Sequence, residues 1–205
     1  DRIEKLLKSF ALSAFLCVGW GALSLLGVLR LSVRFEPVEF LWLAYNVLIS
    51  FLFLIRRRPS VVSMDVVHWM IAVLTCFSGF LFSESAGAPS RAFAVSGDIM
   101  IVLGLLVGIA AAVVLGRNYD FLPAVRGVST ALVYRVVRHP MYLASVLIKL
   151  GYVARHPSCF NAGLFVLVAL LYVKRAKYEE ETMMADARYV RYMERVRYRF
   201  IPGFF

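Results

Sequence analysis

The chain has 205 residues, of which 61% are apolar and 18% are charged, whereas a soluble domain is about half apolar and about a quarter charged. Its net charge of +10 would suit nucleic acid, but the Lys and Arg residues gather at the ends of apolar blocks and in the C-terminal tail. That placement favours anionic lipid headgroups as the partner and argues against nucleic acid. Long apolar blocks predict an integral membrane protein.

A helix needs roughly 17 to 25 residues to cross the hydrocarbon layer, and two of the six apolar blocks reach that length without their flanks. The last two blocks are short, which is typical of spans that border a cavity. We therefore expect an all-α integral membrane bundle of about five to six transmembrane helices, in a single domain of residues 1–205. The N-terminal spans occupy 1–115, and the C-terminal half, 116–205, contains the two short spans. The blocks are Phe10–Leu31, Phe40–Ile55, Val66–Phe82, Phe93–Leu115, Met141–Val153 and Cys159–Val173.

The distribution of basic residues predicts the orientation. If all six blocks cross and the N-terminus is cytoplasmic, 18 of the 23 Lys and Arg residues lie in the inside segments 1–9, 56–65, 116–140 and 174–205. The positive-inside rule therefore predicts a multi-pass protein with both termini in the cytoplasm. The run Arg56-Arg57-Arg58 is the clearest marker, and we interpret it as a topology anchor.

A first polar cluster lies in the stretch Tyr134–Tyr142, YRVVRHPMY. Pro140 suits the first turn of a helix, which places Arg138 and His139 at a helix N-terminus, where free N–H groups and the helix dipole favour an anion. A carboxylate or a phosphate is the expected ligand. The alternative is that the pair only caps the span at the headgroup layer.

A second polar cluster, Glu179-Glu180-Glu181, follows the last apolar block. Carboxylates accept hydrogen bonds from ribose hydroxyls and from an ammonium group, so the cluster could bind the other end of the same ligand. The alternative is a solvated run of charges that pair with neighbouring basic residues.

The C-terminal tail is rich in Arg and Tyr. Arg188, Arg191 and Arg195 recur at helical spacing, while Tyr189 and Tyr192 fall on a neighbouring face. The pattern predicts a basic helix on the membrane surface, and tyrosine faces can also hold a sulfonium by cation–π attraction.

Several polar residues lie within the apolar blocks or at their edges. Intramembrane charges such as Asp98 and Lys149 are costly and raise a functional hypothesis, although both lie toward the outer ends and can instead extend to the headgroups. Cys17, Cys76 and Cys159 form no C-x-x-C pair, so neither a disulfide framework nor a metal site is expected.

The ordered set of motifs resembles the isoprenylcysteine carboxyl methyltransferase family, which is related to the membrane phospholipid methyltransferases. The resemblance covers about the C-terminal ninety residues. The family often has Gly-Pro where this chain has Leu132-Val133, and Gly where it has Ala144. The motifs that carry the resemblance are Leu115-Gly116-Arg117-Asn118, Tyr134, Arg138-His139-Pro140-x-Tyr142, Glu179-Glu180, Tyr189-x-x-Tyr192 and Arg199-x-x-Pro202.

The resemblance implies an S-adenosylmethionine-dependent methyltransferase in which residues 116–205 form the catalytic region, with a cofactor pocket that faces the cytoplasm. Arg138 and His139 would then hold the cofactor carboxylate, and the Glu pair would hold its ribose or ammonium group. Methyl transfer is an in-line displacement, so the protein's main tasks are alignment and exclusion of water. The resemblance implies catalytic roles for Arg138, Glu180 and Arg199, and cofactor-binding roles for Tyr134, Arg138, His139, Pro140, Tyr142, Glu179, Glu180 and Tyr189.

The expected acceptor is lipophilic and enters from the bilayer. A prenylcysteine-like carboxylate is favoured because the tail is basic, and a phospholipid amine is the first alternative. Membrane steroid reductases share a similar C-terminal pattern and use NADPH, but an adjacent Glu pair is unsuited to a 2′-phosphate. A non-catalytic membrane bundle is the remaining alternative.

Overall fold

The computed structural model describes residues 10–33, 37–84 and 89–203 of the chain. Within them, six long or medium helices follow the six apolar blocks in order, and a short seventh helix follows in the tail. The helices are α2 Phe10–Val33, α3 Pro37–Ile55, α4 Val66–Phe77, α5 Arg91–Leu115, α6 Pro140–Arg155, α7 Cys159–Met183 and α8 Ala187–Arg195. The expected helical architecture is confirmed.

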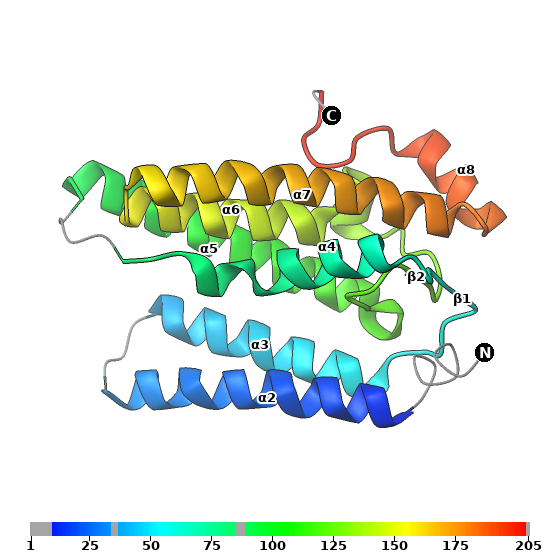
Figure 1. The fold of residues 1–205 in the computed structure, drawn as a ribbon, viewed down its shortest axis with the longest axis horizontal. Coiled ribbons are helices and arrows are strands. Elements are labelled where there is room, and N and C mark those ends of the chain that lie inside the picture. The colour runs from blue at the N-terminus through cyan, green and yellow to red at the C-terminus, as the bar shows by residue number, and fades with distance from the viewer. Residues whose placement is uncertain (1–9, 34–36, 85–88, 204–205) are drawn as a thin grey trace.

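The helices run nearly parallel to one long axis and alternate in direction (Figure 1). The pair α2 and α3 forms one layer, α5, α6 and α7 lie on the other side, and α4 packs on α7. Because the directions alternate, the segments after α3, after α5 and after α7 all emerge at the same end of the bundle, together with α8. The polar clusters of the sequence therefore gather at that end.

Length and hydropathy separate the helices. Within the described residues, three segments are long and apolar enough to cross a membrane, namely Val38–Ile55, Arg91–Asn118 and Cys159–Met183. Ser13–Ala22 and Val66–Leu81 are shorter apolar helices. An integral membrane protein is thus supported, while five to six crossings stay a prediction.

The helix α7 continues ten residues beyond the predicted block, to Met183. The sequence placed Glu179–Glu181 after the span, but these residues form the last turns of the helix itself. Lys, Arg and Glu are good helix formers, so the loss of apolar character at Lys174 does not end the helix. The carboxylates are consequently held in fixed helical directions.

Small residues allow α5 and α6 to approach closely. A Cβ added at Gly97 would lie 2.7 Å from the carbonyl oxygen of Gly151, and one added at Gly151 would lie 2.6 Å from that of Gly97. Close backbone contact of this kind is a common way to pack helices in membranes. It fixes α6, which begins at the first polar cluster, against the longest apolar helix.

Two short strands depart from the all-α expectation. Val61–Val62 pairs antiparallel with Ala124–Val125, with Val61 opposite Val125. The pairing ties the connection after α3 to the long segment between α5 and α6. That segment also contains two 3₁₀ turns, Gly116–Asn118 and Leu132–Arg135.

Candidate functional site

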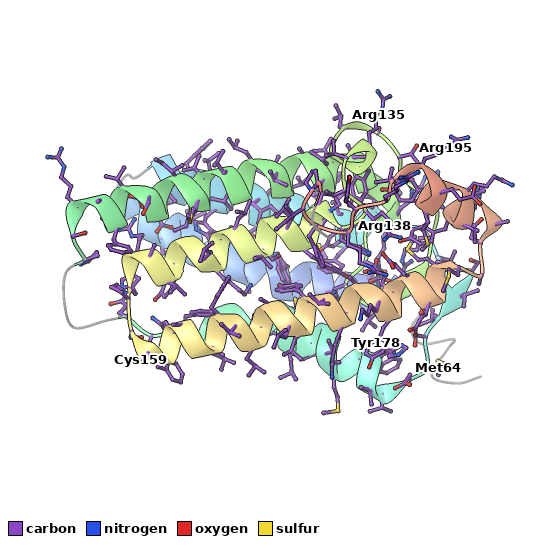
Figure 2. All side chains as sticks on the ribbon, turned by 90° about the horizontal axis from the view of Figure 1, so that it is seen from above. Met64, Arg135, Arg138, Cys159, Tyr178 and Arg195 are labelled. Atoms are coloured by element: carbon purple, nitrogen blue, oxygen red, sulfur yellow. The ribbon has the colours of Figure 1, made fainter. Side chains whose placement is uncertain are left out.

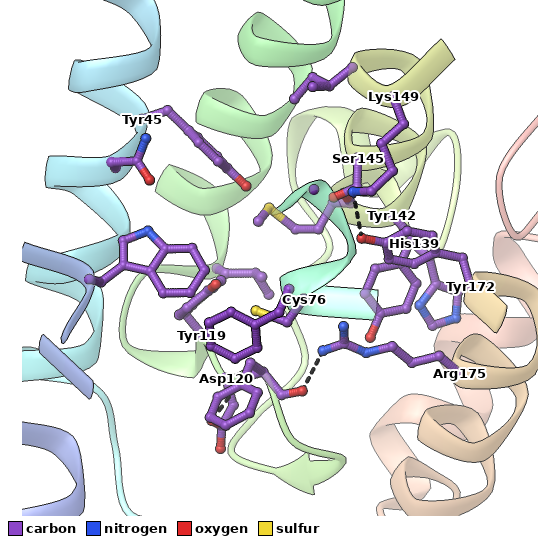
Figure 3. A pocket seen from close by; sticks show the side chains of 18 of the residues that line it. Tyr45, Cys76, Tyr119, Asp120, His139, Tyr142, Ser145, Lys149, Tyr172 and Arg175 are labelled. Carbon is purple, nitrogen blue, oxygen red and sulfur yellow. Dashed lines mark hydrogen bonds between the residues drawn. The ribbon is translucent and has the colours of Figure 1, made fainter. Parts of the chain in front are cut away.

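A cavity of about 750 Å³ lies between α3, α4, α6, α7 and α8 (Figure 3). Its volume is within the range of roughly 300–1,000 Å³ that is usual for small-molecule sites. One end is lined by Tyr189 and Tyr192 of α8, and the lining reaches Arg155 and His156 at the far end of α6. The cavity therefore extends from the polar end of the bundle along most of the length of α6.

The start of α6 is held by the C-terminal segment. Pro140 is the first helical residue and His139 is its N-cap. The backbone N–H of Arg138 donates to the carbonyl of Tyr198 at 2.9 Å, and that of His139 donates to the carbonyl of Arg199 at 2.9 Å. Since protein carbonyls satisfy these two N–H groups, a ligand at this corner would be bound mainly through the side chains.

The buried carboxylate of Glu180 joins the side chains of two arginines and one histidine. It accepts from His139 Nε2 at 3.0 Å and from Arg199 Nε at 3.0 Å, and it lies 3.4 Å from Arg138 Nε. Because an ionised carboxylate only accepts, His139 donates through Nε2. The two polar clusters of the sequence thus meet, but Glu180 contacts Arg138 and His139 directly and does not itself line the cavity.

Glu179 lies on the cavity side of α7. It accepts a hydrogen bond from the hydroxyl of Tyr142, and both residues line the cavity. The Tyr142 ring stacks on the imidazole of His139, with centroids 5.2 Å apart and an angle of 4° between the planes. One carboxylate, one imidazole and one aromatic face are therefore presented together.

Tyrosines close the same end of the cavity. The hydroxyl of Tyr192 donates to the carbonyl of Tyr134 at 2.7 Å, which holds α8 against the segment before α6. The buried hydroxyl of Tyr189 has no hydrogen-bond partner among the described residues, and burial raises its pKa, so it stays a neutral donor. A buried polar group without a partner beside a cavity is suited to bind a ligand.

The candidate residues from the sequence fall into three groups. Those that line it are Tyr134, Arg138, His139, Tyr142, Glu179 and Tyr189. Pro140 and Glu180 are buried behind the lining, and Arg199 contacts Glu180. Glu181 and Arg195 are exposed, as is Arg188, which pairs with Asp186. Figure 2 shows Arg138 at the same end of the molecule as Arg135 and Arg195, with Cys159 at the other.

The sequence reading missed Arg175. Its side chain is buried, donates to the hydroxyl of Thr75 at 2.8 Å and to the carbonyl of Phe121, and lies 4.9 Å from the centroid of the Tyr142 ring. Arg175 follows Tyr172 by three residues and precedes Glu179 by four. This spacing places all three on one face of a helix, a signal that would have predicted them as cavity residues.

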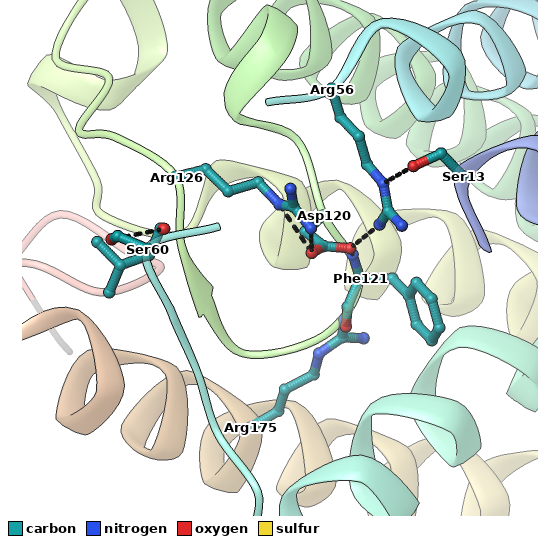
Figure 4. A network of polar contacts seen from close by, with 8 residues as sticks. Ser13, Arg56, Ser60, Asp120, Phe121, Arg126 and Arg175 are labelled. Carbon is teal, nitrogen blue, oxygen red and sulfur yellow. Dashed lines mark hydrogen bonds and ion pairs between the residues drawn. The ribbon is translucent and has the colours of Figure 1, made fainter. Parts of the chain in front are cut away.

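A buried ion cluster holds the segment between α5 and α6 in place (Figure 4). Asp120 accepts from Arg56 at 2.6 Å and from Arg126 Nε at 2.8 Å, and the side chain of Arg56 is only 2% exposed. The sequence pattern marks Arg56 as part of a topology anchor. The structure adds a role that the local sequence does not reveal, because Asp120 is sixty-four residues away.

Comparison with protein families gives one match. Residues 92–189 match the model of the family described as phospholipid methyltransferase, a family that includes the isoprenylcysteine carboxyl methyltransferases. The matched region runs from the start of α5 into α8, and it contains every cavity-lining candidate named above. A search of curated proteins gave no match. Within the described residues there is no group of three or more His, Cys, Asp or Glu residues that would hold a metal.

Proposed function

We propose that this chain, whose residues 92–189 match the model of the phospholipid methyltransferase family, transfers a methyl group from S-adenosylmethionine to a lipophilic acceptor. The match supports a membrane methyltransferase in general terms, and the identities of the cofactor and the acceptor are our further proposal. The observation that carries the proposal is the cavity itself. It joins a polar, aromatic end to a region enclosed by apolar helices.

The residues at the polar end fit the donor. Arg138 and His139 are suited to its carboxylate, and Glu179 is suited to its ammonium group or ribose hydroxyls. The free hydroxyl of Tyr189 adds a donor for a ligand oxygen or nitrogen. Tyr142 presents an aromatic face that can attract a cation. When bound, S-adenosylmethionine supplies an electrophilic methyl group on a sulfonium.

Glu180 and Arg199 have a different position in this proposal. Glu180 is enclosed by Arg138, His139 and Arg199, so we propose that it positions the side chains of Arg138 and His139, which face the donor. Arg199, one-quarter exposed, completes the cluster around Glu180. The resemblance implies direct roles for both residues; because neither lines the cavity, we propose positioning roles for them.

The favoured acceptor is a carboxylate. A carboxylate oxygen would form the new C–O bond while the C–S bond breaks and a neutral thioether leaves, so no proton has to move. The protein then needs to align the two reactants and to exclude water, and a buried, partly aromatic cavity does both. A phospholipid amine is the second candidate, favoured by the description of the matched family; it would have to lose a proton.

Titration calorimetry of the purified protein tests the donor. We expect S-adenosylmethionine and S-adenosylhomocysteine to bind and NADPH not to bind. His139→Ala and Glu179→Gln should each weaken donor binding by about 1 kcal/mol or more, since each removes a charge-assisted contact. Arg135→Ala is the matched control, because Arg135 is exposed and three residues from Arg138.

The results separate the candidate classes. Binding of NADPH alone would support a reductase, and no binding of any of the three would support a non-catalytic bundle. Unchanged affinity in both variants would mean that the donor site lies elsewhere. Mass spectrometry of a prenylcysteine analogue and of phosphatidylethanolamine after incubation with the donor then decides between carboxyl and amine methylation.

A further inference from the structure

The cavity continues past the proposed donor end along α6. On this helix Tyr142, Ser145 and Lys149 follow one another at spacings of three and four residues, and all three line the cavity. They therefore share one helical face. The face changes from a tyrosine beside Glu179 to a lysine at the level of the apolar helices. A cation at that depth requires an explanation.

Lys149 has only neutral partners in the part of the chain that the structure describes. Its Nζ lies 3.4 Å from the hydroxyl of Tyr172 and 5.3 Å from the centroid of that ring, and no described carboxylate lies within ion-pair distance. A charged side chain among apolar helices is costly unless it is paired or serves a function. Lys149 thus lacks the counter-ion that its surroundings favour.

The side chain of Lys149 is directed toward the donor end. Side chains on a helix tilt toward its N-terminus, and α6 begins at His139 and Pro140. Figure 3 shows the amino group beside the Tyr172 hydroxyl and beside Ser145, which precedes Lys149 by four residues on α6. The Tyr172 hydroxyl donates to the carbonyl of Thr75 at 3.0 Å, so its oxygen is free to accept from Lys149.

Two further hydroxyl groups open into the same cavity. Tyr45 of α3 and Tyr119 both line it, and neither hydroxyl has a hydrogen-bond partner among the described residues. Figure 3 shows both side chains pointing into the space on the side opposite Lys149. The Tyr45 ring packs on α5, where a Cβ at Gly108 would lie 3.1 Å from its Cε2. Its position is therefore set by the packing of α3 on α5.

We propose that Lys149 binds the anionic group of the lipophilic acceptor, and that the hydroxyl groups of Tyr45 and Tyr119 face this group from the opposite wall of the cavity. The identification of the ligand as a methyl acceptor rests on the proposed function, whereas the anion site itself does not. An ammonium and two neutral hydroxyl donors suit an oxyanion, and they disfavour a cationic headgroup. In a weakly polar cavity the pairing is stronger than in water. A carboxylate and a phosphate share the required chemistry.

Direct binding of an anionic lipid tests the site without any methyl donor. The probe is dansylundecanoate, a fluorescent long-chain carboxylate, added to the full chain in dodecyl maltoside micelles, and its methyl ester is the neutral control. We expect Lys149→Met to weaken binding of the carboxylate by about tenfold or more, because a charge-assisted contact is lost. Binding of the ester should change little. Lys149→Arg should keep most of the affinity.

Lys174→Met is the matched control, because Lys174 is exposed on α7 and outside the cavity lining; it should behave as the wild type. Tyr45→Phe should also weaken binding of the carboxylate, as Lys149→Met does, and should leave binding of the ester unchanged. Dodecyl phosphate competing more strongly than dodecanoate would identify a phospholipid-like acceptor. The reverse order would identify a free carboxylate.

Two results would overturn the proposal: equal carboxylate affinity in Lys149→Met and wild type, or an equal loss for carboxylate and ester. Failure of the proposed function gives a different pattern. In that case S-adenosylmethionine does not bind, while the carboxylate still binds in a way that depends on Lys149. Donor titration of Lys149→Met should match wild type, since Lys149 lies beyond the donor residues.

Discussion

At the scale of single residues, Leu132 is the one described non-glycine residue with a positive φ, at 47°. A left-handed conformation costs an L-residue about 1–2 kcal/mol. The resembling family often has glycine at this position, which adopts such angles freely. The departure at Leu132 therefore introduces local strain in the turn before Tyr134, while the course of the chain is kept.

Leu132→Gly should relieve that strain. We expect the free energy of unfolding to rise by about 0.5–1 kcal/mol, because part of the relief is offset by the greater freedom of glycine in the unfolded chain. Thermal unfolding in detergent measures the change. Leu132→Ala is the control, since it shortens the same exposed side chain and keeps the conformational cost. A gain in the alanine variant equal to that in the glycine variant would contradict the argument.

The departure at Ala144 has a different outcome. Ala144 is fully buried, and its Cβ would lie 3.4 Å from a Cβ added at Gly108. Its methyl group therefore packs against α5 and does not line the cavity. A contact between α5 and α6 is non-local, so the family pattern alone could not reveal that this methyl group leaves the site unobstructed.

Helical phase explains what the sequence predicted and what it did not. The sequence predicts that Arg138 and His139 lie near the Glu triplet, and Glu180 contacts both in the structure. The sequence could not assign different directions to Glu179 and Glu180, because the helix was expected to end with the apolar block, before these residues. On a helix that continues to Met183, neighbouring residues point about 100° apart. Glu179 then faces the cavity, and Glu180 faces Arg138, His139 and Arg199.

At the scale of elements, the order and type of the helices follow from the apolar blocks. The connections between them do not. Asp120 joins Arg56, at the end of α3, to Arg126 in the segment before α6, and no local pattern links these residues. The same holds for the backbone bonds from Arg138 and His139 to the C-terminal segment, which depend on the whole bundle being assembled.

Asp120→Asn should be strongly destabilising. It leaves the nearly buried guanidinium groups of Arg56 and Arg126 without their carboxylate, and removing one partner of a buried pair costs about 3–5 kcal/mol. Thermal unfolding in detergent should show a clear decrease in the transition temperature. Arg57→Ala is the neighbouring control, because Arg57 is exposed and its backbone bond to Arg117 remains. Equal, small effects of both changes would mean that the cluster contributes little.

At the scale of the whole molecule, the two ends of the bundle differ in polarity. One end, where β1, β2 and α8 lie, contains the proposed donor site and also Asp120 with Arg56 and Arg126. At the opposite end Asp98 pairs with Arg155. This pairing answers the question that the sequence raised about Asp98, since the carboxylate has a partner on the adjacent helix and takes no part in the site proposed above.

The alternation of six helices makes the topology testable. We expect single cysteines at three exposed residues, Ser60 after α3, Thr130 between α5 and α6, and Arg197 after α8, to react with an impermeant maleimide only from the cytoplasmic side. A cysteine at Ser90, before α5, should react only from the other side, because α5 connects the two ends. The background protein has Cys17, Cys76 and Cys159 replaced by Ala.

Reaction of Ser90→Cys and Thr130→Cys from the same side would exclude α5 as a membrane span. The positive-inside rule gives the direction, so reversed labelling of all four would place the proposed donor site away from the cytoplasm, where S-adenosylmethionine is expected.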